Sequence, residues 1–177
     1  LISAADGWIL TQNGGALHWD GATWQDRSAA VTPLGSGPYV GEVAMISPDL
    51  AVAAGGNAIL TDAGGRWQPV SLADRQVVVN AVDVLSPTFG VAAGSIIDAQ
   101  RVGEQRYAAW QYEGGGWTVQ SNELPTCGRN SILDVSLVDH EFGVAAGYRG
   151  CQGGYGEMMQ FNFGRWGWSG TQTDFGL

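Results

Sequence analysis

The chain contains no lysine, and it has only two histidines and two cysteines among its 177 residues. All eight basic residues are arginines, against 17 aspartates and glutamates, which gives a net charge of -9. A strongly acidic chain repels polyphosphate backbones and anionic lipid surfaces. We therefore expect no nucleic-acid partner for this protein.

The sequence also lacks long apolar runs and sustained helical periodicity. No stretch approaches the roughly 18 apolar residues that a membrane-spanning helix needs, so we expect no span within this chain. Apolar residues nevertheless make up 45% of the composition, enough for a sizeable core, and glycine is abundant, at 28 residues. Abundant glycine without a 3.6-residue apolar stripe predicts strands and turns rather than helices.

What the chain does contain is an internal repeat. The phrase Gly-Val-Ala-Ala-Gly occurs at residues 90–94 and 143–147, a close copy occupies residues 51–55, and a divergent copy occupies residues 7–11. The positions four residues before these copies, 3, 47, 86 and 139, are 44, 39 and 53 residues apart. A second apolar run and then a tryptophan follow each copy: Trp24, Trp67, Trp117 and Trp166. Repeats of this length without helical periodicity are typical of β-propeller blades.

Each repeat therefore predicts one blade of four short antiparallel strands. The predicted fold class is all-β, a propeller-type array with four repeats in this chain, at approximately residues 1–27, 40–70, 77–120 and 131–170. Small side chains in a strand let neighbouring sheets approach closely, so we assign the repeated phrase to packing between blades. Residues 1–177 form a single propeller domain or a portion of one.

Short motifs in the repeats resemble the Asp-box (BNR-like) group of bacterial propellers, whose pattern is Ser-x-Asp-x-Gly-x-Thr-Trp. The residues kept in register are Asp62, Gly64 and Trp67 in the second repeat, Gly21, Thr23 and Trp24 in the first, Gly114 and Trp117 in the third, and Trp166 in the fourth. The order of motifs along nearly the whole chain is similar to the photosystem II stability and assembly factor family. That resemblance implies a subunit or assembly partner of a membrane-bound complex, in photosynthesis.

The first repeat is short at its start, because only two residues precede position 3. One interpretation is that residues 171–175 return to supply the missing strand and close a small four-bladed ring. The other is that the chain forms part of a larger propeller, and the usual blade number of the resembling family favours this second interpretation.

The longest insertions in the repeats are predicted to share one face of the propeller. Residues 28–38, 95–105 and 148–156 all fall on connections that lie on the same side of a blade array, and loops on a rigid scaffold often carry function. The candidate binding residues of this face are Tyr39, Asp98, Arg101, Glu104, Tyr148, Arg149 and Tyr155. We expect no catalytic residue, no metal site and no cofactor.

The two cysteines, Cys127 and Cys151, fall on connections of that same face. We expect a disulfide, which would close a loop of about 24 residues and contribute roughly 3 kcal/mol to stability. A structural disulfide places the protein in an oxidising, extracytoplasmic compartment: periplasmic, lumenal or secreted. Two free buried thiols are the alternative, and a metal pair is disfavoured because no histidine lies at ligand spacing.

Two functions of different classes follow from these observations. The first is a non-enzymatic module that binds a protein partner or acts as a scaffold. The second is a glycan-active hydrolase of Asp-box type, in which Asp98 and Glu104 would act as acid and base while Arg101 and Arg149 bind an acidic sugar. Convergence of these four side chains on one central pocket would favour the hydrolase, and their dispersal would favour the binding module.

Overall fold

The computed structural model describes residues 3–11, 15–30, 42–47, 50–63, 66–70, 72, 76–97, 104–114, 116–120, 128–150, 155–162 and 165–173. In these ranges the regular secondary structure is β-strand apart from one short 3-10 helix, η1 (Ser28–Ala30). The predicted all-β class is confirmed. No helix in the described ranges has the length and hydropathy needed to cross a membrane.

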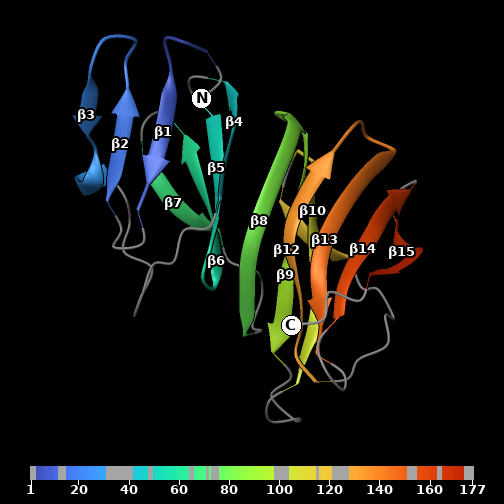
Figure 1. The fold of residues 1–177 in the computed structure, drawn as a ribbon. Helices are drawn as coiled ribbons and strands as arrows, with labels where there is room; N and C mark the ends of the chain where they lie inside the picture. Colours follow the sequence, from blue (N-terminus) through green and yellow to red (C-terminus); the bar gives the residue numbers. More distant parts are fainter. Residues whose placement is uncertain are drawn as a thin grey trace.

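The strands form four antiparallel sheets that follow one another along the chain (Figure 1). Sheet 1 contains β1 (Gly7–Leu10), β2 (Ala16–Trp19) and β3 (Trp24–Asp26). Sheet 2 contains β4 (Glu42–Ser47), β5 (Leu50–Gly55), β6 (Ala58–Ala63) and β7 (Trp67–Val70). Sheet 3 contains β8 (Val77–Ser86), β9 (Phe89–Ile97), β10 (Gln105–Tyr112) and β11 (Trp117–Gln120). Sheet 4 contains β12 (Asn130–Leu137), β13 (Phe142–Arg149), β14 (Tyr155–Asn162) and β15 (Arg165–Thr173).

Each sheet is a simple meander, because strands that are neighbours in sequence are also neighbours in the sheet. This arrangement is that of propeller blades, so the predicted architecture is confirmed. The first strands of sheets 2, 3 and 4, which we call the inner strands, are β4, β8 and β12, and they lie next to one another.

The repeated phrase packs between sheets, as its small side chains predict. In β9, Val91 and Ala93 point toward sheet 4, where they join a core with Ile132 and Met159. The alternate residue Ala92 points the other way and joins the core between sheets 2 and 3. A third core, between sheets 1 and 2, packs the indole of Trp8 edge-on against that of Trp67 (5.5 Å between ring centroids).

A glycine of the phrase is required by close backbone approach within sheet 3. A β-carbon added at Gly94 would lie 1.9 Å from the carbonyl oxygen of Val78 in the neighbouring strand. The strand pairing is irregular here, because β8 carries a bulge between Val79 and Ala81. Only glycine fits beside that bulge without moving the backbone.

Polar side chains of the inner strands join sheet 2 to sheet 3 and sheet 3 to sheet 4. The carboxylate of Glu42 in sheet 2 accepts a hydrogen bond from the amide of Val82 in sheet 3 (2.9 Å). The carboxylate of Asp83 in sheet 3 accepts one from the amide of Leu137 in sheet 4 (2.7 Å). Backbone amides between sheets that would otherwise lack a hydrogen-bond partner thereby gain one. At both boundaries the acceptor lies on the earlier sheet and the donor on the later one.

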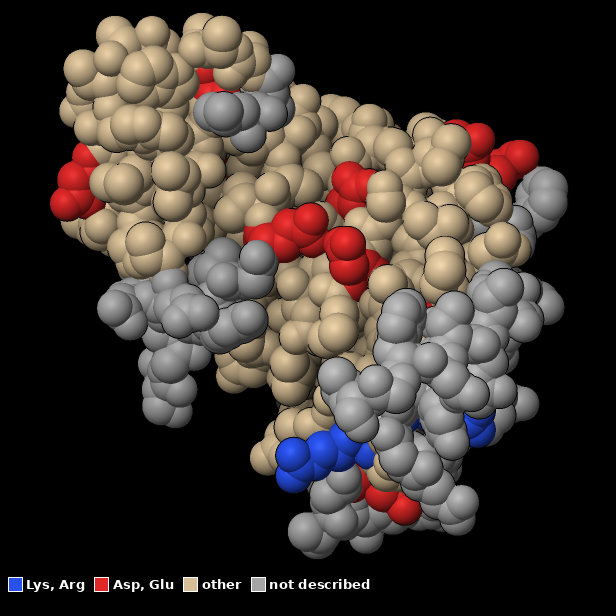
Figure 2. Space-filling model, in the orientation of Figure 1, with Lys and Arg blue, Asp and Glu red and all other residues tan. Residues whose placement is uncertain are grey.

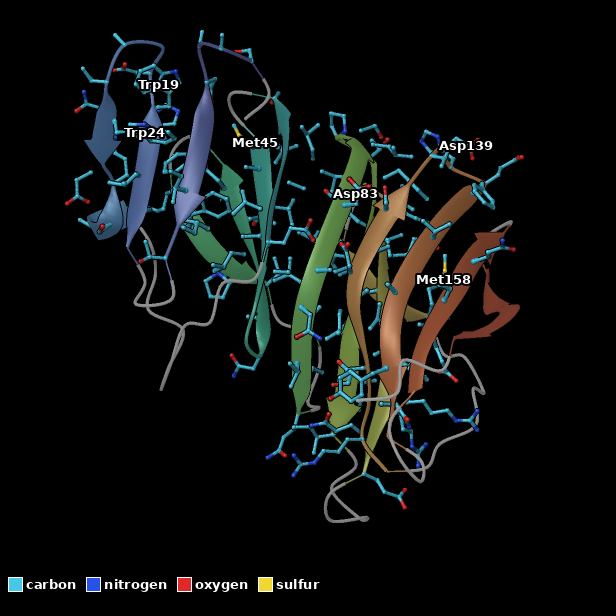
Figure 3. All side chains as sticks on the ribbon, in the orientation of Figure 1. Trp19, Trp24, Met45, Asp83, Asp139 and Met158 are labelled. Carbon is cyan, nitrogen blue, oxygen red and sulfur yellow. The ribbon has the colours of Figure 1, made fainter. Side chains whose placement is uncertain are left out.

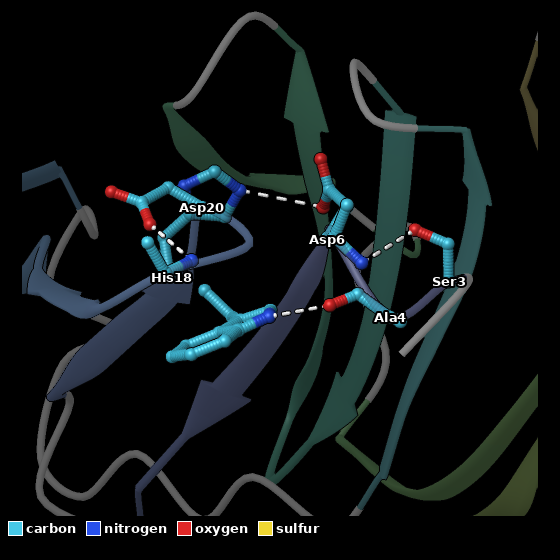
Figure 4. A network of polar contacts seen from close by, with 8 residues as sticks. Ser3, Ala4, Asp6, His18 and Asp20 are labelled. Atoms are coloured by element: carbon cyan, nitrogen blue, oxygen red, sulfur yellow. Dashed lines mark hydrogen bonds and ion pairs between the residues drawn. The ribbon is translucent and has the colours of Figure 1, made fainter.

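Sheet 1 is fastened at its upper end in Figure 1 by a set of polar contacts that Figure 4 shows from close by. The indole nitrogen of Trp19 donates to the carbonyl of Ala4 (2.8 Å), and His18 Nε2 lies 3.4 Å from the carboxylate of Asp6. Asp20 accepts hydrogen bonds from two backbone amides of its own turn, those of Ala22 and Thr23, and these bonds lower the pKa of its carboxyl group. Through its contact with Asp6, His18 has a structural role in sheet 1.

The last described residues extend sheet 4. Residues 171–173 belong to β15, and Gln172 and Thr173 pair with Glu157 and Gly156 of β14. These residues thus do not supply a strand to sheet 1, which stands at the opposite side of the view in Figure 1. The small closed ring that would need them in sheet 1 is not formed by the described residues.

Candidate functional site

The strand ends of sheets 3 and 4 come together at the lower side of the view in Figure 1. The backbone amide of Gln105 donates to the carbonyl of Gly128 (3.0 Å), which joins the start of β10 to the segment before β12. Arg149 and Tyr155, at the end of β13 and the start of β14, are direct partners across the sheet. We call this region, residues 104–107, 128–130, 148–150 and 155–157, the loop face.

A buried asparagine holds the loop face together. The side chain of Asn130 donates to the carbonyl of Gln105 (3.0 Å) and accepts from the amide of Gly150 (3.1 Å). Asn130 is fully buried, so both ends of its amide satisfy backbone groups from different strands. This side chain therefore fixes the position of three chain segments at once.

A second buried cluster lies beside Asn130 and includes a charge. The hydroxyl of Tyr107 lies within hydrogen-bonding distance of the carbonyl of Tyr148 (3.0 Å) and of a carboxylate oxygen of Glu157. The guanidinium of Arg149 lies 3.5 Å from the other oxygen of the same carboxylate. Glu157 is buried while Arg149 is partly exposed, so the arginine compensates a buried negative charge from the solvent side.

The tyrosine in this cluster acts as a neutral hydrogen-bond donor. Burial raises the pKa of Tyr107 far above its usual value, and the hydrogen bond to Glu157 raises it further. A neutral hydroxyl next to a carboxylate forms a charge-assisted hydrogen bond, which is stronger than one between neutral groups. The Tyr107, Arg149 and Glu157 cluster is therefore a rigid platform whose outer edge is the arginine.

The structure brings together part of the predicted site. Glu104, Tyr148, Arg149 and Tyr155 all belong to the loop face, with Glu104 half-buried just before β10. Tyr39, Asp98, Arg101, Cys127 and Cys151 lie outside the described residues. The hydrolase hypothesis needed Arg149 as a sugar-binding cation, but this arginine is placed against Glu157.

Sequence reasoning did not identify Tyr107, Asn130 or Glu157 as residues of this region. The sequence does contain a signal for two of them, namely a polar or charged residue in an otherwise apolar strand. Glu157 precedes two methionines, and Asn130 begins an apolar segment. Such a residue in a strand that packs between sheets must find a partner. The identity of that partner depends on strand register, which the sequence does not show.

A second charged region lies on the inner strands. Figure 2 shows acidic side chains gathered over β4, β8 and β12, and Figure 3 labels Asp83, which belongs to β8. Burial raises the pKa of Glu42, and the negative charges of Asp134 and Asp83 raise it further. Within the part of the chain that the structure describes, no group of three or more histidine, cysteine, aspartate or glutamate side chains is arranged to hold a metal ion.

No family model matches this chain. No curated protein sequence matches it either. Similarity is found among solved structures. A structure of YCF48 bound to a D1 peptide superimposes with a TM-score of 0.56 at 14% identity, over 96% of this chain and 51% of that one. A structure of YCF48 from Cyanidioschyzon merolae gives a TM-score of 0.57 at 20% identity, over 96% of this chain and 53% of that one.

At these identities the similarity concerns the fold, and the predicted resemblance to an assembly-factor propeller is confirmed at that level. Both superpositions extend over 96% of this chain. The chain therefore shares the β-propeller fold of YCF48 and spans about half the length of the YCF48 structures that it matches.

Proposed function

We propose that this chain is a non-enzymatic propeller module that binds a protein partner, as a subunit or assembly partner of a membrane-bound complex. The observation that carries the proposal is the match of 96% of the chain to YCF48 bound to a D1 peptide. A propeller scaffold hosts many functions, so the proposal also needs a surface on this chain that suits a protein ligand.

The loop face is the surface that we assign to the partner. Its side chains come from four different strands, β10, β12, β13 and β14, and the buried bonds of Asn130, Tyr107 and Glu157 hold those strands in place. A rigid base lowers the conformational cost of binding. Arg149 at the outer edge can donate to a carboxylate or a backbone carbonyl of a peptide, and arginine and tyrosine are enriched in protein interfaces.

We further propose the disulfide between Cys127 and Cys151 and, with it, a periplasmic, lumenal or secreted location. Their chain neighbours, Gly128 and Gly150, lie against each other: a β-carbon added at Gly128 would be 2.5 Å from the carbonyl oxygen of Gly150. Gly128 has a positive φ of 68°, which favours glycine at this close approach. Non-reducing mass spectrometry tests the bond, because a disulfide lowers the mass by two hydrogens, whereas an unchanged mass would remove the argument for an oxidising compartment.

A fluorescently labelled D1 peptide tests the binding proposal directly. We expect its anisotropy to rise saturably as the full chain is added. Arg149→Ala should weaken binding about tenfold, the size of a modest interface hot spot. Arg27→Ala is the matched control, because Arg27 is an exposed arginine that follows β3 of sheet 1 and is not part of the loop face, and it should leave the affinity unchanged.

Two checks keep this experiment interpretable. Arg149→Lys keeps a positive charge near Glu157 and so keeps the compensation of that buried carboxylate. An affinity between those of the original chain and of Arg149→Ala would show that Arg149→Ala loses binding contacts and not only stability. Absence of saturable binding would reject a D1-like partner. Saturable binding that neither Arg149 substitution weakens would reject the loop face as the site.

A further inference from the structure

One apolar position of the repeat is at least partly exposed in three successive sheets. The residues directly before positions 47, 86 and 139 are Ile46, Leu85 and Val138. Leu85 and Val138 are 36% and 65% exposed, and Ile46 is partly exposed. We call these three residues the turn ridge. Apolar side chains scattered singly over a surface are ordinary, whereas a set of them at one repeated position indicates an interaction surface.

Local backbone geometry turns the ridge residues out of their strands. The strand pairing shifts at Ile46 in β4 and at Leu85 in β8, so each is the extra residue of a β-bulge. A bulge changes the direction of the side chain that it carries. Val138 stands directly after β12, where its amide donates to the carbonyl of Phe142 (2.9 Å). Leu85 is exposed although sheets 2 and 4 cover both sides of sheet 3, so its exposure comes from the bulge.

The strand ends that carry the ridge in sheets 3 and 4 are fixed against each other. Just before the ridge position, Asp83 of β8 accepts the hydrogen bond from the amide of Leu137 of β12 (2.7 Å). Just after it, the ring centroids of Phe89 and His140 lie 4.6 Å apart. These two contacts hold the ridge residues of both sheets on neighbouring strand ends. A surface that is fixed before binding loses little conformational entropy when a partner arrives.

Negative charge accompanies the turn ridge. Asp83 lies two residues before the ridge position of β8, and Asp139 and Glu141 follow the ridge residue of sheet 4 in its turn. Figure 3 labels Asp83 and Asp139 at this upper side of the view. The inner strands and the described turns after β8 and β12 contain no arginine, and the arginines drawn blue in Figure 2 lie at the lower side. Such a surface repels anionic lipid and attracts positive groups.

We propose that the turn ridge is a second interaction surface, and that it binds a segment of a protein partner in which apolar residues stand next to lysine or arginine. The apolar side chains of the segment cover Leu85 and Val138, and its positive charges lie near Asp83 and Glu141. Complementary charge selects the partner, and burial of the ridge stabilises the complex. The loop face lies at the opposite side of the view in Figure 1, so this proposal is independent of the proposed peptide binding there.

An NMR titration of the full chain with a short peptide of alternating leucine and arginine tests the proposal. We expect saturable shifts of the amide signals of residues 84–86 and 138–141, and none at the loop face. A peptide in which glutamate replaces arginine should bind at least about tenfold more weakly, because its charges have the same sign as those beside the ridge.

Substitutions separate the apolar contribution from that of charge. Leu85→Ser and Val138→Ser should each weaken binding of the leucine–arginine peptide about fivefold. Val119→Ser is the matched control: Val119 is 42% exposed on β11, outside the turn ridge, and its variant should bind like the original chain. Glu141→Arg should weaken binding of that peptide about threefold and strengthen binding of the leucine–glutamate peptide by a similar factor.

Three outcomes would overturn the proposal. The first is the absence of saturable shifts. The second is a set of shifts spread evenly over the acidic surface, or binding that neither serine substitution weakens, since either would reduce the effect to attraction by net charge. The third is equally tight binding of the leucine–glutamate peptide. Circular dichroism and the urea midpoint of each variant show whether it is folded, so a loss of binding is not mistaken for a loss of structure.

Discussion

Strands β9 and β13 contain the same five-residue phrase and have different surroundings. In β9 both sides of the strand are buried, because sheets 2 and 4 cover sheet 3 from either side. In β13 one side is buried against sheet 3, while Ala146 on the other side is exposed. The same residues therefore act as core in one sheet and as surface in the next, and coverage rather than sequence decides which.

The repeated phrase therefore specifies a surface on which another sheet can pack. It does not specify whether that surface is buried. Alanine and glycine give a strand two flat sides on which another sheet can pack closely. Whether a partner is present depends on the position of the sheet in the stack. Substitutions at equivalent positions of covered and uncovered sheets should consequently differ in cost.

The largest difference is expected between two repeated tryptophans. Trp67 is fully buried between sheets 1 and 2, so Trp67→Ala should lower the free energy of unfolding by roughly 4 kcal/mol. Trp24→Ala, at the equivalent position of the uncovered face, should cost only about 1 kcal/mol. Urea unfolding measures both, and equal losses would show that sheet 1 is covered in solution.

A smaller difference is expected between two alanines of the phrase. Ala93→Leu adds three carbons to the filled space between sheets 3 and 4 and should destabilise the protein by about 2 kcal/mol. Ala146→Leu points to solvent and should change the free energy of unfolding by less than about 0.5 kcal/mol. Hydrogen exchange of the β9 and β13 amides localises the effect, and a stability loss from Ala146→Leu comparable to that from Ala93→Leu would contradict the description of β13.

The smallest effect concerns the carboxylate that joins sheet 2 to sheet 3. Burial and the nearby charges of Asp134 and Asp83 raise the pKa of Glu42 above its usual 4.5, so the folded state binds this proton more tightly than the unfolded state. Stability from Glu42 is therefore present at low pH and is lost as the pH rises through the folded pKa.

Glu42→Gln should stabilise the protein by about 0.5 kcal/mol at neutral pH, since the amide can still accept the hydrogen bond from Val82. The gain should vanish in acid, where the original side chain is protonated. Chemical denaturation from acid to neutral pH measures this gain in the free energy of unfolding. Glu141→Gln, at an exposed turn, is the matched carboxylate-to-amide control and should leave the free energy of unfolding unchanged; a gain for Glu42→Gln that persists in acid would argue against the assigned cause.

Much of the fold could be predicted because its signals are local. The phrase at residues 90–94 and the glycine-rich turns before Trp67 and Trp117 specify strands and hairpins within a few residues of themselves. Pairings between segments that are far apart in the sequence leave no such local signal. Whether residues 171–175 supply a strand to the first repeat was left open by the sequence, and only strand register shows that residues 171–173 extend sheet 4.

The site was less predictable because its contacts cross large sequence separations. The insertions indicated the loop face, and Arg149 was among its expected residues. Its actual partner, Glu157, and the tyrosine 50 residues away that bonds to the same carboxylate follow from how two sheets dock. A carboxylate such as Asp83, which reaches the backbone of the next sheet, is equally invisible in a single sequence.

The bonds that Glu42 and Asp83 make run from one sheet to its successor and not back. The second and third repeats thus each carry a carboxylate acceptor for the sheet that comes after them. Duplication of one repeat within the gene would lengthen the array without any new contact having to evolve, because the added unit would receive bonds from its predecessor and offer them to its follower. The blade number of such proteins can change by copying alone, and the order of the copies has a built-in polarity.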